Sequence, residues 1–150
     1  MSDESPTAHR RTGAQMADQA LSWARPDRSF FAAGACHILA WEFVKSSAGR
    51  NFQVMGLRRV GEPHTFHVFA TDGAVALDFA GLRGRREMLT VIADAVAAER
   101  PGTTIEELEL PVSLEGFCAA HRHRLPGQFS GDVQARARRY LTQILGARGA

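Results

Sequence analysis

The chain has 150 residues, of which 45% are hydrophobic and 23% charged, as in an ordinary globular protein large enough to bury a core. Its formal net charge of +2 does not predict a nucleic-acid-binding protein. No stretch reaches the ~18 apolar residues of a membrane span, and the N-terminal residues lack the apolar core of a signal peptide. These features predict a cytoplasmic protein, or an effector delivered without a cleaved signal.

The first part of the chain is expected to lead into one buried helix. Residues 1–14 are polar and are expected to form a disordered tail, followed by a single papain-like α+β domain over residues 15–150. A short amphipathic helix is expected in GAQMADQALSWA and ends at RPDR. After Gly34, the sequence predicts a helix to about Ser46 that has almost no polar face. Such a helix is typical of the centre of a domain.

The middle and the end of the chain predict a sheet and further helices. FQVMGLRRV, HTFHVFAT and AVALDFAG are expected to be strands, and Asp72–Gly73 predicts a two-residue hairpin between the last two. REMLTVIADAVAAER is an amphipathic helix, TTIEELELPV is either a short strand or a helical turn, and SLEGFCAAH and SGDVQARARRYLTQIL are helices. The sequence therefore predicts an α+β fold, with a buried helix on an antiparallel sheet of at least three strands and flanking C-terminal helices.

Cys36 is the first candidate for chemistry. It falls in the expected first turn of the buried helix, where free backbone N–H groups and the helix dipole stabilise a thiolate. The small residues of AAGA before it let the backbone approach a substrate, and their amides could hold an oxyanion. A buried cysteine can equally be a packing residue, and a bridge to Cys118 stays open. A nucleophile would also need a base.

His67 and Asp78 are candidates for the base and its orienting acid. His67 lies in mid-strand, and Asp78 interrupts an apolar strand on a face otherwise made of alanines, which we expect to pack against the Cys36 helix. A carboxylate there is costly unless it is paired. With Asp72–Gly73 as the turn, Asp78 lies directly opposite His67 on the same face. The alternative is a structural pair between Asp78 and an arginine such as Arg83.

A cysteine at the start of a central helix, with a histidine and an aspartate on successive strands, resembles the papain-like and transglutaminase-like cysteine superfamily. GAC followed by HVFATDGAVALDFAG is similar to small bacterial members, and the resemblance covers about residues 34–81. It implies that Cys36 is the nucleophile, His67 the general base and Asp78 the orienting acid. Papain-type enzymes also carry a glutamine before the cysteine as an oxyanion donor. No clear counterpart is present among Gln15 and Gln19, the glutamines upstream of Cys36.

Other residues are candidates for a substrate pocket or a metal site. Ala35, His37 and Trp41 flank Cys36 and are the candidate substrate-binding residues, although His37 and Trp41 are also compatible with core packing. The segment CAAHRHR could bind a metal, but a solvated basic helix end is the simpler interpretation. The arginines of GLRGRREM could bind a phosphate, or they could simply lie in an exposed loop. We expect no metal and no cofactor.

The function expected from these residues is thiol-dependent acyl transfer. Cys36 would attack a carbonyl or carboxamide of a protein, a peptide or a small amide, as in amidases, deamidases, peptidases and transglutaminases. The small size suits an intracellular enzyme or a toxin domain of a larger effector. The alternative is a catalytically idle domain of the same fold that binds a protein partner or a small ligand.

Overall fold

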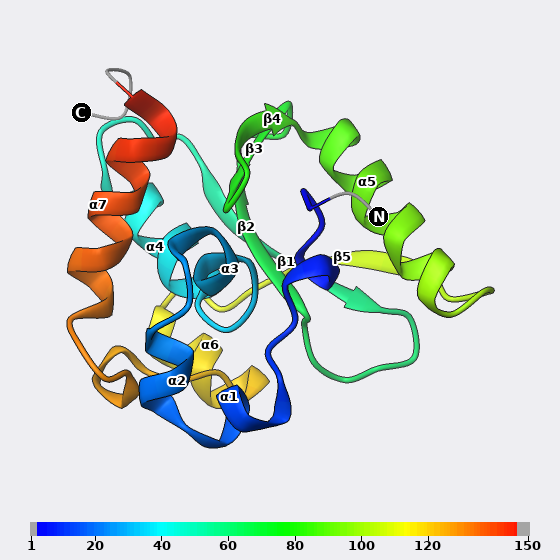
Figure 1. The fold of residues 1–150 in the computed structure, drawn as a ribbon. Coiled ribbons are helices and arrows are strands. Elements are labelled where there is room, and N and C mark those ends of the chain that lie inside the picture. The colour runs from blue at the N-terminus through cyan, green and yellow to red at the C-terminus, as the bar shows by residue number, and fades with distance from the viewer. Residues whose placement is uncertain (1–2, 147–150) are drawn as a thin grey trace.

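The structure is a computed structural model that describes residues 3–146 (Figure 1). In chain order its elements are η1 (Pro6–His9), α1 (Gly13–Ala17), α2 (Gln19–Trp23), α3 (Asp27–Ala32), α4 (Cys36–Lys45), β1 (Gln53–Arg59), β2 (His67–Thr71), β3 (Val75–Asp78), β4 (Gly81–Gly84), α5 (Arg85–Glu99), β5 (Ile105–Glu109), α6 (Leu114–His121), η2 (Pro126–Gln128) and α7 (Val133–Leu145). The strands form one antiparallel sheet of order β4-β3-β2-β1-β5. The predicted α+β fold is confirmed.

Helices cover both faces of the sheet and create two cores. On one face α4 packs on β2 and is covered in turn by α3, α6 and α7, whereas α5 lies on the other face (Figure 1). The larger core contains Phe31, Ile38 and Leu77, and the smaller one contains Phe69 and Ile92. Within residues 3–146, no helix is both long enough and apolar enough to cross a membrane.

The buried helix α4 starts and ends as the sequence predicts. Gly34 has φ +114°, a conformation that L side chains rarely adopt, and it lets the chain turn into the helix two residues later. Every residue from Cys36 to Phe43 is buried, in agreement with the missing polar face. Helix α4 therefore forms the centre of the larger core, and its first turn lies beside the start of β2.

The N-terminal part of the chain differs from the expected disordered tail. Residues 3–14 have defined positions, with η1 packed against α3 and α5 and with Ser5, Pro6 and Thr7 buried. The helix expected in GAQMADQALSWA is divided at Asp18, which is extended and whose carboxylate caps α2 by accepting the Ala20 N–H (2.9 Å). The capping propensity of aspartate outweighs the continuous apolar pattern here.

Two further elements were not expected. Helix α3 begins at Asp27, within RPDR, and GLRG forms the edge strand β4 instead of an exposed loop or a helix start. The ambiguous TTIEELELPV contributes β5, which pairs with β1 at the other edge of the sheet. The sheet thus has five strands where the sequence predicted at least three.

The β2–β3 hairpin has a different register from the predicted one. Thr71 pairs with Ala76 rather than with Ala74, which moves the centre of the turn from Asp72–Gly73 to Gly73–Ala74. Gly73 still supplies the positive φ (+102°) that a tight hairpin turn requires. The Asp72 carboxylate accepts backbone N–H groups across the turn, which favours this position over the predicted one.

The shift of two residues preserves the faces of the strands. Side chains alternate with a period of two, so His67 and Asp78 remain on one face, as diagonal instead of directly opposite neighbours. The expectation that this alanine-rich face packs against the Cys36 helix is wrong. Ala76 lies in the smaller core beneath α5, whereas Leu77, of the opposite parity, packs toward α4.

Candidate active site

Cys36 is the first residue of α4 and lies at the wall of a cleft of about 520 Å³. Ala35 precedes the helix and offers no capping side chain, so the first-turn N–H groups have no side-chain acceptor at this position. These groups and the positive end of the helix dipole favour a negative charge beside the sulfur. The thiol is free and only 4% exposed, with its open side toward the cleft.

His67 and Asp78 form a buried pair behind Cys36. His67 Nε2 lies 2.9 Å from Asp78 Oδ2, and both side chains are inaccessible to solvent. Asp78 Oδ2 also accepts a hydrogen bond from Arg83 Nη2 (2.7 Å), and Asp78 Oδ1 accepts the Ala80 N–H (3.0 Å). The two alternatives considered for Asp78 are therefore both present, because one carboxylate oxygen contacts the imidazole and the arginine together.

The second ring nitrogen of His67 is not held by the carboxylate, and the ring interacts with Cys36. Nδ1 is buried and has no hydrogen-bond partner of standard geometry. Burial opposes the charged imidazolium, but hydrogen bonding to Asp78 and to the Cys36 thiol outweighs it and raises the pKa of His67 to about 9. Catalytic hydrogen bonds are often long before a substrate binds. The three predicted catalytic residues are thus together, with His67 between the thiol and the carboxylate.

The charge state of Asp78 follows from the same contacts. Burial alone would raise the pKa of this carboxyl, but the hydrogen bond from His67 and the charges of His67 and Arg83 hold it below its usual value. The carboxylate therefore stays ionised at neutral pH. An ionised acceptor at Nε2 fixes the ring orientation and stabilises a positive imidazole.

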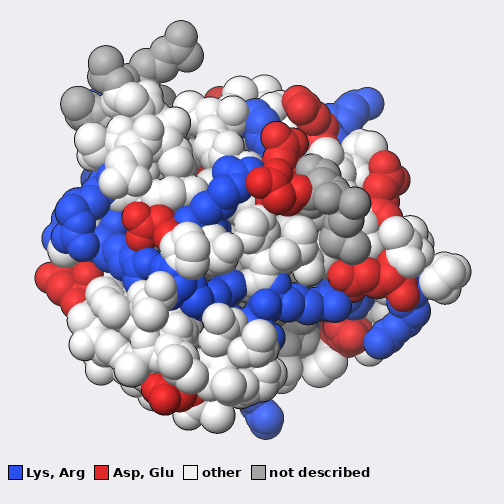
Figure 2. All heavy atoms as spheres, in the orientation of Figure 1, with Lys and Arg blue, Asp and Glu red and all other residues white. Residues whose placement is uncertain are grey.

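The walls of the cleft come from four separate parts of the chain. They are formed by Arg10, Arg11, Met16, Ala33, Gly34, Cys36, Thr65, Phe66, Arg122, His123 and Arg124. None of these residues is acidic. Burial holds the pKa of His123 at about 4, so the positive charge of the cleft at neutral pH comes from its arginines. Figure 2 shows basic side chains in a band across the middle of the face seen in Figure 1.

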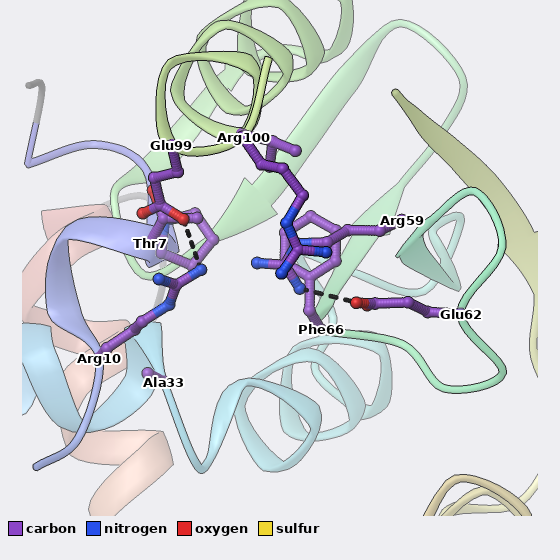
Figure 3. Close-up of a pocket in the computed structure, with 10 residues that line it drawn as sticks. Thr7, Arg10, Ala33, Arg59, Glu62, Phe66, Glu99 and Arg100 are labelled. Carbon is purple, nitrogen blue, oxygen red and sulfur yellow. Dashed lines mark ion pairs between the residues drawn. The ribbon is translucent and has the colours of Figure 1, made fainter. Parts of the chain in front are cut away.

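A second hollow of about 440 Å³ adjoins this cleft (Figure 3). The two share Arg10, Ala33 and Phe66 in their walls. In the second hollow Arg10 pairs with Glu99 (2.6 Å), and Arg59 lies over the Phe66 ring and pairs with Glu62 (3.6 Å). It contains none of the three predicted catalytic residues.

The predicted substrate-binding residues Ala35, His37 and Trp41 do not line the cleft. All three are buried: His37 Nε2 contacts the Arg124 carbonyl (2.8 Å), and Trp41 Nε1 donates to the Val112 carbonyl (3.2 Å). The helical repeat explains these positions, because one step of about 100° turns residue 37 away from the side that residue 36 faces. Sequence proximity to Cys36 is a poor guide to the pocket for this reason.

The two upstream glutamines have local roles. Gln15 completes the capping box of α1 with Thr12, and Gln19 lies beside the Arg124 guanidinium. Neither lines the cleft, so the papain-type oxyanion glutamine has no counterpart there. Among residues 3–146, no group of three or more histidine, cysteine, aspartate or glutamate side chains is placed to hold a metal.

Sequence reasoning missed the residues that give the cleft its charge. Arg11 was assigned to a disordered tail, and Arg124 to a solvated helix end. The sequence predicts Arg83 as a candidate phosphate ligand or as an alternative partner of Asp78, but not that it contacts the same carboxylate oxygen as His67. A signal for Arg11 was absent because its neighbours are polar and show no periodicity.

No family model, curated protein or solved structure matches this chain. Any proposal about its function therefore rests on the geometry of Cys36, His67 and Asp78 and on the cleft beside Cys36.

Proposed function

We propose that the protein is a thiol-dependent acyl-transfer enzyme of the papain-like or transglutaminase-like type, with Cys36 as nucleophile, His67 as general base and acid, and Asp78 as orienting group. The observation that carries the proposal is the position of His67. One of its nitrogens is held by a buried carboxylate, and the ring also interacts with a thiol at the wall of a cleft. Nucleophile, base and orienter in this order are the arrangement that covalent acyl transfer requires.

In the proposed first half-reaction, the Cys36 thiolate attacks the carbonyl carbon of an amide, and the C=O electron pair moves to the oxygen. Backbone N–H groups at the start of α4 are positioned to stabilise that oxyanion. The C–N bond then breaks, the leaving amine takes the proton from His67 Nδ1, and an acyl thioester remains on Cys36. Asp78 stabilises the imidazolium until the proton is transferred.

In the second half-reaction, water or an amine attacks the thioester. His67 Nδ1 accepts the proton of the attacking group, the C–S bond breaks, and the Cys36 thiolate leaves. Water gives hydrolysis or deamidation, and an amine gives transfer. Proteins, peptides and small amides all fit this chemistry, and their carbonyl would enter through the cleft.

A catalytically idle binding domain is the alternative function. It would be favoured by a Cys36 sulfur sealed beneath the core or far from His67. Instead, Cys36 borders the cleft and interacts with His67, and the Asp78 carboxylate contacts the imidazole. These contacts support the proposal of an enzyme over that of an idle binding domain.

Alkylation of the two cysteines tests the proposal directly. Cys36 and Cys118 are equally exposed, at 4% each, so accessibility does not distinguish them. Burial raises the pKa of the Cys118 thiol, whose sulfur donates to the Arg124 carbonyl (3.4 Å). We expect iodoacetamide to label Cys36 at least about tenfold faster than Cys118 at pH 7, as measured by peptide mass spectrometry.

The matched variant is His67→Gln, which keeps a polar side chain but cannot accept the proton. It is expected to reduce the Cys36 rate to that of Cys118 while leaving the Cys118 rate unchanged. Equal and slow labelling of both cysteines, unaffected by this substitution, would remove the case for an activated thiol. A melting curve of His67→Gln shows whether the fold is retained.

The protonation of His67 is a second test. Its pKa of about 9 predicts that the imidazole stays positive through neutral pH, whereas burial holds the pKa of His37 at about 3. Since the folded pKa of His67 exceeds the unfolded value, its stabilising contribution is complete below about pH 6.5 and is lost as the pH rises through about 9. Histidine NMR titration checks this, and a neutral His67 at pH 7 would contradict it.

A further inference from the structure

Arg11 combines a buried guanidinium nitrogen without a hydrogen bond and the lack of a carboxylate partner among the described residues. Its Nη1 atom is buried and makes no hydrogen bond, and no carboxylate pairs with it within residues 3–146. By contrast, Arg10, its neighbour in the chain, pairs with Glu99. A half-buried guanidinium without an acceptor is costly, and a buried unsatisfied donor of this kind points to a missing partner.

The position of Arg11 relates it to the nucleophile. Its side chain packs along Gly34, where a Cβ would lie 3.3 Å from Arg11 Nε, and Gly34 precedes Cys36 by two residues. Arg11 and Cys36 both line the cleft, and they are close enough to interact electrostatically. The absence of a side chain at Gly34 therefore allows the guanidinium to approach the mouth of the site.

A second arginine adds to the same charge. Arg124 also lines the cleft, and its guanidinium contacts the Met16 carbonyl (3.3 Å) and the Gln19 amide, which are both neutral. Burial and then the charge of Arg124 lower the pKa of Arg11. Two like charges held together in a cleft without acidic residues repel each other, and an anion between them would relieve that repulsion.

We infer that the acyl donor carries an anionic group, a carboxylate or a phosphate close to its reactive carbonyl, and that Arg11 with Arg124 binds this group. The inference rests on the proposed function, because the anion is placed relative to a carbonyl that Cys36 attacks. Arginine is suited to this role since its planar donors match the oxygens of both anions. Neutral amides of the same size would then be the poorer substrates.

Iodoacetate and iodoacetamide form a matched pair of reagents for the test. Each alkylates a thiolate by forming a C–S bond and releasing iodide, and they differ only in a carboxylate against a carboxamide. No tetrahedral oxyanion forms, so the ratio of their rates reports anion recognition apart from oxyanion stabilisation. Dividing by the same ratio for 2-mercaptoethanol removes the intrinsic reactivity of the reagents.

We expect the normalised iodoacetate preference of Cys36 to be on the order of tenfold and to fall to about one in Arg11→Gln. Arg11→Lys, which keeps the charge, should retain part of it, and Arg124→Gln should reduce it. Arg139→Gln is the matched control, because Arg139 is exposed on α7 and does not line the cleft. Added salt should weaken the preference.

Protection experiments distinguish the two anions. Succinate and inorganic phosphate are compared, at equal ionic strength, for slowing the iodoacetamide labelling of Cys36. Protection by either that disappears in Arg11→Gln supports the inference and identifies the anion. Protection by neither, or an iodoacetate preference unchanged in Arg11→Gln, overturns it. If Cys36 reacts with neither reagent, the proposed function itself fails, which is a separate result.

Discussion

Asp78→Asn is expected to lower the acylation of Cys36 by an activated ester, such as p-nitrophenyl acetate, by roughly 10⁴-fold, the cost of the equivalent change in a serine protease triad. Asparagine is nearly isosteric, but it cannot stabilise an imidazolium, and its amide would favour the wrong ring tautomer. The pKa of His67 should also fall, since Asp78 is the main group that raises it against burial. Ester turnover and histidine NMR measure both effects.

Asp78→Asn also disturbs a second contact, so it needs a matched variant. Arg83 Nη2 donates to the same oxygen that His67 contacts, and Asp78 is almost completely buried. Arg83→Gln removes this ion pair but leaves the His67–Asp78 contact in place. We expect both variants to lose stability, on the order of 1–3 kcal/mol. Only Asp78→Asn should lose acylation beyond about tenfold.

The comparison separates a catalytic pair from a structural one. Equal losses of acylation in Asp78→Asn and Arg83→Gln would show that Asp78 matters only by holding the sheet edge together. A stable Asp78→Asn protein with undiminished Cys36 reactivity would exclude the triad altogether. Chemical denaturation of each variant shows how much of any loss comes from unfolding.

Arg136→Met is expected to cost the largest share of folding stability, about 3–5 kcal/mol. Arg136 lies in α7 and pairs with Asp27 (2.7 Å), while it also donates to the carbonyls of Trp23 and Arg25 (both 2.8 Å). Its guanidinium lies 4.0 Å from the centre of the Phe30 ring. Methionine preserves the volume but leaves two buried carbonyls without a donor.

The control for this prediction is Arg139→Met, three residues further along α7 and exposed. It removes an equal charge and should change the free energy of unfolding by less than about 0.5 kcal/mol. Urea denaturation of both variants gives the comparison. A loss below about 1 kcal/mol in Arg136→Met would mean that the contacts of Arg136 do not hold α2 and α3 against α7.

The grouping of Cys36, His67 and Asp78 was predictable because the signals of these residues are local. A small-residue loop before an apolar run marks the start of α4 at Cys36, and strand alternation places His67 and Asp78 on one face. The predicted register was wrong by two residues, yet the pair survives because two is the period of a strand. An error of one residue would have put the two side chains on opposite faces.

The cleft could not be predicted because it is assembled from distant segments. Arg11 and Arg124 are more than a hundred residues apart in the chain, and both lie in polar stretches without periodicity. The edge strand β4 was missed for a related reason, because its glycines and arginine resemble a loop until β3 pairs with them. Tertiary pairing outweighs local propensity at such positions.

The segment of residues 3–12 has a consequence for how the molecule folds. It supplies Arg10 and Arg11 to the cleft, the Glu4 carbonyl to Arg83 and the His9 carbonyl to Arg25. Another part of the cleft wall, Arg124, lies more than a hundred residues further along the chain. Bringing together segments so far apart costs loop-closure entropy before their contacts form, so the cleft is expected to be completed late in folding.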